Sequence, residues 1–152
     1  MSLTLRHTLA TVAYRGGKAL RSAPAGFSGV SAGEGSRTAG EILAHICDLF
    51  DWGATMAQGE QVWAPRAPQS WEADCDRFFD GLAKFDHALE SPVEGSEAML
   101  FQGPIADALT HIGQISLLRR LGRSPVRAEN YARAEITSGR VGRDQTAPRA
   151  EF

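Results

Sequence analysis

The sequence contains only two cysteines, Cys47 and Cys75, which form no CxxC pair or dense cluster. They could form one disulfide, but so few cysteines are more typical of a reduced cytoplasmic protein than of a secreted disulfide scaffold. Long apolar runs are also missing, because no segment approaches the roughly 18 apolar residues of a membrane span. Near the N-terminus, Arg6 and His7 interrupt the continuous apolar segment that a signal peptide needs. These absences predict a soluble, cytoplasmic protein with no membrane partner.

Neither sign of charge dominates, since the chain has 16 Lys and Arg residues and 18 Asp and Glu residues. The basic residues do gather late, with eight arginines against four acids from Arg119 onward. In that segment only Tyr131 and Phe152 could stack on nucleic-acid bases. We therefore expect no nucleic-acid partner. With 152 residues, of which 43% are hydrophobic, the chain is long enough for one domain with one core.

Apolar residues recur at helical spacing in four segments, and no convincing strand pattern is present. The predicted helices cover residues 3–22, a segment from Thr38 to just before Pro65, residues 70–90 and residues 104–122. Thr38 and Glu41 have the spacing of a capping box at the start of the second helix. Pro104 is a residue type favoured at the first position of a helix, and Gly122 is a natural stop.

Four amphipathic helices in so short a chain predict an all-α protein that forms a four-helix bundle. The bundle is expected to be an antiparallel up-down arrangement or a crossover variant of it, built from residues 1–122. Residues 123–152 are polar and weakly patterned, and are expected to form a largely irregular tail that packs on the same domain or extends from it. The tail has room for a short helix near Tyr131. Whether Asn130 and Tyr131 fold back over a functional site stays open.

The last predicted helix carries Asp107 and His111 one turn apart in an otherwise apolar run, with Gln114 in the same angular sector. One interpretation is an ordinary ion pair on a solvated face. The other is an inward-facing polar patch with two ligands for a metal ion. Arg119 and Arg120 point in other directions around this helix, which favours the inward patch.

On the second predicted helix, His45 lies at the rim of the apolar face and Asp48 lies across from it. A lone histidine there is commonly a satisfied boundary residue. Combined with Asp107 and His111, however, it completes a set of two imidazoles and one carboxylate from two helices. Such a set can hold a catalytic zinc ion, and it also suits ferrous iron. By contrast, His7 and His87 are predicted to have no site role, His87 because it faces solvent, and both cysteines are predicted to be small core or boundary residues.

The stretches TAGEILAHICDLFDW and PIADALTHIGQISLLRRLG resemble the DinB-like (YfiT-like) superfamily of small metal-binding four-helix bundles. Members of this family carry one histidine on the second helix and a pair four residues apart on the last, the second of which precedes a Gly-Gln dipeptide. His45 matches the histidine on the second helix, and His111 matches the second histidine of the pair, with Gly113 and Gln114 as the Gly-Gln dipeptide. Asp107 stands where the family usually has histidine, which keeps the ligand count and replaces a nitrogen by an anionic oxygen.

The resemblance implies a divalent ion, zinc or nickel, with iron also compatible, and a class that includes thiol-dependent transferases, a maleylpyruvate isomerase and hydrolases. The leading hypothesis is a metal-dependent enzyme that uses a low-molecular-weight thiol or water to attack a small electrophilic substrate. His45, Asp107 and His111 would hold the ion, and Gln114 and Asp48 would orient the ligands or the substrate. The alternative is a non-catalytic dimeric binding or scaffold protein with a residual metal site. The resemblance also implies a homodimer.

Overall fold

The structure, a computed structural model, describes residues 1–152 and is all-helical. Its four long helices are α1 (Leu3–Leu20), α2 (Ala39–Ala57), α3 (Trp71–Ala88) and α5 (Ala106–Leu121). The shorter elements are the 3-10 turns η1 (Phe27–Gly29) and η3 (Tyr131–Arg133), the single turn α4 (Glu97–Leu100) and the π-helical turn η2 (Phe101–Ile105). The predicted all-α class is therefore confirmed. No helix combines the length and the apolar character needed to cross a membrane.

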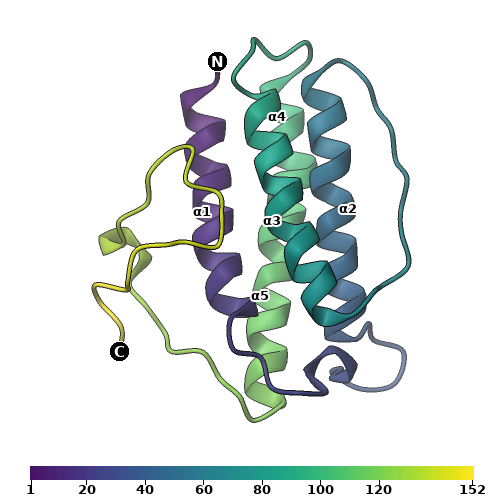
Figure 1. The fold of residues 1–152 in the computed structure, drawn as a ribbon, viewed down its shortest axis with the longest axis vertical. Helices are drawn as coiled ribbons and strands as arrows, with labels where there is room; N and C mark the ends of the chain where they lie inside the picture. The colour runs from purple at the N-terminus through teal and green to yellow at the C-terminus, as the bar shows by residue number, and fades with distance from the viewer.

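The four long helices lie side by side with α1 and α2 at opposite corners (Figure 1). Both α1 and α2 pack against α3 and α5. In Figure 1, α1 and α5 run downward, whereas α2 and α3 both run upward. Residues 58–70, called the crossover segment below, therefore return along the length of α2 before α3 begins. This order places α2 directly beside α5.

The start of α2 follows the predicted capping box, but the helix ends at Ala57 rather than just before Pro65. Thr38 Oγ1 accepts a hydrogen bond from the Glu41 amide, and the Glu41 carboxylate accepts one from the Thr38 amide. This reciprocal pairing satisfies amides that the first helical turn leaves without partners. At α3, the Ser70 hydroxyl accepts from the Ala73 amide in the same way.

The prediction that the last long helix begins at Pro104 was wrong. Helical turns begin at Glu97, and Pro104 lies inside the π-helical turn that leads into α5. Proline lacks the amide that an α-helix needs at an interior position, and its ring crowds the carbonyl one turn earlier. The wider π-helical turn shifts the hydrogen-bond register locally, so the chain stays helical through the proline. The predicted end is correct, because Gly122 caps α5.

The core is a single cluster of buried apolar side chains from all four long helices. Its centre holds an apolar stripe of residues at helical spacing along α3 and its C-cap, all of them 0% exposed: Phe78, Leu82, Phe85 and Leu89. Gly53 of α2 allows close approach here, because a Cβ added to it would stand 2.4 Å from Phe85 Cε1. Cys47 and Cys75 are free thiols, and both are buried in this core as predicted.

Residues 123–152 are irregular apart from η3 and one isolated bridge between Glu129 and Glu151. The segment lies beside α1, on the opposite side of the molecule from α2 (Figure 1). The Glu129 carboxylate accepts a hydrogen bond from the Tyr14 hydroxyl at 2.6 Å and pairs with Lys18 at 3.2 Å. Tyr131 stacks edge-on against Tyr14, at 6.1 Å between ring centroids. Asn130 and Tyr131 therefore do not cover the site formed by α2 and α5.

Candidate metal centre

Three side chains predicted as ligands meet between α2 and α5. His45 comes from the first half of α2, whereas Asp107 and His111 lie one turn apart in the first half of α5. One donor atom from each lies within 4.8 Å of the other two. The helical spacing brings the two α5 residues together, and the direct packing of α2 on α5 adds His45.

The distances between the donors suit a small divalent ion. The Asp107 carboxylate faces both rings, with Oδ2 at 3.4 Å from His45 Nε2 and Oδ1 at 3.4 Å from His111 Nε2. A tetrahedral ion with bonds of about 2.0–2.1 Å holds neighbouring ligands about 3.3 Å apart. At 3.4 Å a direct hydrogen bond between these groups is long and weak. These two separations use different oxygens of Asp107, and with one donor atom from each residue the set spans up to 4.8 Å, so the three groups are gathered near ligand spacing and satisfy one another poorly.

The protonation of His45 also suits a ligand. Burial lowers the pKa of His45 below its usual 6.5, and the nearby His111 and Arg37 lower it further, while Asp107 opposes the shift. The ring is therefore neutral at neutral pH and keeps a nitrogen lone pair for coordination. The two histidine side chains are 21% and 14% exposed, whereas Asp107 is 45% exposed. The centre is accordingly enclosed on the histidine side and open to solvent at the carboxylate.

Gln114 holds the His111 ring in place. Its Oε1 lies 2.7 Å from His111 Nδ1, so the Nδ1 hydrogen is donated to the amide oxygen and Nε2 is left free to face Asp107. A partner on the far ring nitrogen is what fixes the tautomer and direction of a ligating histidine. The structure thus places Gln114 in contact with a candidate ligand.

Asp48, the other residue expected to orient ligands or substrate, is engaged elsewhere. Its Oδ1 pairs with Arg77 of α3 at 2.6 Å and accepts a hydrogen bond from the Arg66 amide at 3.1 Å. The side chain is 5% exposed. Its contacts tie the crossover segment and α3 to α2, which positions the helix that carries His45.

Arg119 does not mark the solvent side of α5, contrary to what its angular position predicts, because it is only 5% exposed. Its guanidinium donates to the carbonyl oxygens of Ala19 and Arg21, at 2.9 Å each, where α1 ends. Buried arginine is rare, and here a cluster of carbonyl acceptors in the terminal turn of another helix stabilises it. The polar sector of α5 is half open rather than inward-facing, because Asp107 and Gln114 are accessible while His111 is largely covered.

Two tryptophans that sequence periodicity did not assign to the site stand beside it. The Trp63 ring meets His45 edge-on at 5.8 Å between centroids, and Trp52 meets Trp63 at 5.7 Å. Trp63 lies in the crossover segment, where no helical period could predict its direction. The pair forms an aromatic wall on the His45 side of the centre.

An apolar cleft of about 390 Å³ adjoins the opposite side. His111 and Gln114 form one edge of it, and its apolar lining includes Ile42, Leu117 and Leu118. Arg37, which has no carboxylate partner, supplies the positive charge in this cleft. Its volume lies in the range of about 300–1,000 Å³ that is typical of small-molecule sites. The arrangement therefore places candidate ligands next to a space that can admit a small, mainly apolar molecule.

In comparisons with known proteins, no family model matches the chain, and no curated protein or solved structure is detectably similar to it.

Proposed function

We propose that this protein is a metal-dependent enzyme of the DinB-like type, a four-helix bundle that uses a thiol or water to attack a small electrophilic substrate. The observation that carries the proposal is the convergence of His45, Asp107 and His111 within 4.8 Å at the edge of an apolar cleft. The contacts that Asp107 makes with the two imidazoles are long, at 3.4 Å each, so the three groups satisfy one another poorly without a shared ion.

The donor set fits a divalent transition ion. Two neutral imidazole nitrogens and one carboxylate oxygen suit zinc, nickel or ferrous iron, and three protein ligands leave at least one position for another molecule. A bound ion would supply Lewis-acid polarisation and would lower the pKa of a thiol or water at that open position. The charge of Asp107 offsets part of the charge of such an ion.

The surrounding residues then have separate tasks. Gln114 keeps His111 Nε2 directed at the centre through its hydrogen bond to Nδ1. Trp63 covers the His45 ring on the side of the crossover segment. Ile42 and Leu118 contact the apolar body of the substrate, and Arg37 contacts a negatively charged part of it. The proposed substrate is therefore small, mainly apolar and compatible with one anionic group.

A non-catalytic dimeric binding protein with a residual metal site is the second candidate. It is favoured by two exposed leucines on α5, Leu117 and Leu121, which lie one turn apart and are each 55% exposed. Exposed apolar residues on one helix face can mark contact with another chain.

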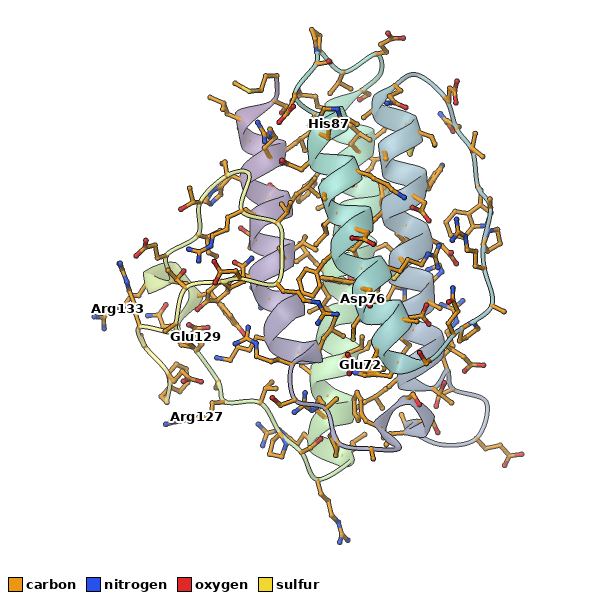
Figure 2. The ribbon with its side chains drawn as sticks, in the orientation of Figure 1. Glu72, Asp76, His87, Arg127, Glu129 and Arg133 are labelled. Carbon is orange, nitrogen blue, oxygen red and sulfur yellow. The ribbon has the colours of Figure 1, made fainter.

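The first test is metal binding, measured by elemental analysis after dialysis against Zn²⁺ or Ni²⁺. The wild-type protein is expected to retain about one ion per chain, and His111→Ala and Asp107→Asn are expected to retain far less. His87→Ala is the matched control, because His87 is 84% exposed near the end of α3 (Figure 2) and pairs only with Glu90. An equal, low metal content in the wild type and in His111→Ala would contradict the proposal.

Tryptophan fluorescence provides an independent readout of where the metal binds. Ni²⁺ at the centre is expected to quench Trp63 and Trp52, which stand beside His45, while Trp71 is packed against Phe27. The quenching should saturate with the metal content and should shrink in Trp63→Phe.

Turnover separates the two candidate functions. The metal-loaded protein would be assayed with low-molecular-weight thiols against epoxide and haloalkane electrophiles, and with water alone. Metal-dependent product formation that is lost in His111→Ala supports the enzyme. Stable metal binding with a dimer in solution and no turnover across the panel supports the binding protein instead.

A further inference from the structure

A second cleft, on another face of α5, is lined by three arginines that have no ionic partner. It has a volume of about 350 Å³ and lies between α1, α5 and the segment of residues 126–131. Its arginines are Arg15 from α1, Arg120 from α5 and Arg127 from the C-terminal segment. No side-chain hydrogen bond or ion pair engages any of the three.

The positive charge of this cleft is not neutralised by its own acidic residue. Glu129 also lines the cleft, but its carboxylate is committed to the Tyr14 hydroxyl and to Lys18 of α1. Tyr131 holds the Arg15 guanidinium over its ring at 4.1 Å, which orients the cation without adding negative charge. The cleft therefore presents an excess of positive charge with at least one arginine held in position.

The remaining lining is suited to an apolar body. Leu109 and Ile112 of α5 and Val126 of the C-terminal segment contribute apolar surface, and Ser116 contributes a hydroxyl. Gly113 lies on the same helix face, and a Cβ added to it would meet no atom within 4 Å. The absence of a side chain at this position keeps the cleft open along the helix.

The cleft is distinct from the candidate metal centre. On α5, its residues Leu109, Ile112 and Ser116 occupy one face, whereas Asp107, His111 and Gln114 occupy another. Only Leu117 borders both this cleft and the apolar cleft beside His111.

We propose that this cleft is a binding site for a small organic anion, in which the arginines hold a carboxylate or phosphate head and the apolar lining holds the body. Guanidinium groups bind such heads with charge-assisted, often bidentate, hydrogen bonds. A cleft of this size, at the lower end of the range of about 300–1,000 Å³, admits a metabolite rather than a polymer. The proposal does not depend on the metal centre.

Isothermal titration calorimetry with octanoate tests the proposal on the full chain. Octanoate is expected to bind saturably, inorganic phosphate more weakly, and the uncharged octanol and the cation octylammonium not measurably. Arg15→Gln and Arg120→Gln are each expected to weaken octanoate binding about tenfold, because each removes a charge-assisted contact. Arg133→Gln is the matched control, since Arg133 points away from the helices (Figure 2).

A bulk substitution tests the location without removing charge. Gly113→Leu is expected to fill the cleft and abolish saturable binding while keeping the helix, because leucine is a far better helix former than glycine. Binding should persist in His111→Ala, which removes a metal ligand from the other face. Circular dichroism confirms that each variant is folded.

Several results would overturn the proposal. The first two are octanol binding as tightly as octanoate and unchanged octanoate binding in Gly113→Leu. The others are loss of octanoate binding in His111→Ala and the absence of saturable binding of octanoate or phosphate at millimolar concentrations.

Discussion

At the scale of single residues, the candidate centre depends on one hydrogen bond that directs an imidazole. Gln114 Oε1 accepts from His111 Nδ1 at 2.7 Å, and this contact leaves Nε2 facing the Asp107 carboxylate. His45 has no comparable partner on its other nitrogen, and its position depends on burial and on the Trp63 ring. The two histidines are therefore held by different means, and Gln114 can be tested separately from the ligands.

Gln114→Ala is expected to weaken metal binding about 10–100-fold, as loss of such partners of ligating histidines typically does. The ring of His111 would lose its fixed tautomer and direction while all three ligands remain. A competition titration with a metal-sensitive dye measures the affinity. Gln102→Ala, at an exposed residue of η2, provides the control and should bind as the wild type does. Equal affinities in the two variants would contradict the positioning role.

At the scale of elements, replacing a glycine by alanine is expected to change the free energy of unfolding in opposite directions in two helices. Gly53 of α2 faces Phe85, and a Cβ there would lie 2.4–3.0 Å from three atoms of that ring. Gly113 of α5 faces open space. Helix propensity alone favours alanine at both positions, so packing decides the sign at Gly53.

Gly53→Ala is expected to lower the free energy of unfolding by about 1–3 kcal/mol, the usual cost of overpacking a core. Gly113→Ala is expected to raise it by about 0.5–1 kcal/mol, because alanine loses less backbone entropy in a helix. Urea denaturation measures both changes. Stabilisation by both substitutions would contradict the close packing of Gly53 against Phe85.

The capping box of α2 gives a second prediction at this scale. Thr38→Ala removes the acceptor for the Glu41 amide at the start of the helix that carries His45. It is expected to lower the free energy of unfolding by about 0.5–2 kcal/mol in urea denaturation. Thr8→Ala is the control, because the Thr8 hydroxyl bonds only to a carbonyl of its own helix. An equal effect of both substitutions would contradict the assigned cap.

At the scale of the whole molecule, burial of the thiols makes the free energy of unfolding fall as the pH rises into the alkaline range. Burial raises the pKa of Cys75 to about 12 and raises the pKa values of Cys47 and of the Tyr14 hydroxyl well above their usual range. Above about pH 8.5 the unfolded chain loses thiol protons that the folded chain keeps. Since stability falls with pH wherever the unfolded state binds fewer protons, alkaline pH favours unfolding.

The midpoint of urea unfolding is therefore expected to fall steadily from pH 8 toward about pH 10.5, the range in which free thiols and phenols titrate. Cys75→Ala should reduce the steepness of this fall. A thiol reagent should also label both cysteines rapidly in urea and slowly in the native protein. Rapid native labelling of Cys75 would contradict its burial.

Several features could be read from the sequence because their causes are local. The caps at Thr38 and Gly122, and the apolar stripe through Phe78 and Phe85, depend on residues within a few turns of one another. The i, i+4 pairing of Asp107 with His111 is local in the same sense. Pro104 misled the prediction because a π-helical turn, which no apolar period signals, accommodates it within the helix.

What the sequence by itself determined was the set of helices and the polar residues that each one carries, because backbone hydrogen bonding and capping are decided over short distances. Only the tertiary structure decided which helices are neighbours. The crossover before α3 places α2 against α5, which brings His45 to Asp107, and the end of α1 supplies the carbonyl groups that allow Arg119 to be buried. The arginine-lined cleft likewise exists only because α1, α5 and residues 126–131, which are distant in sequence, pack together.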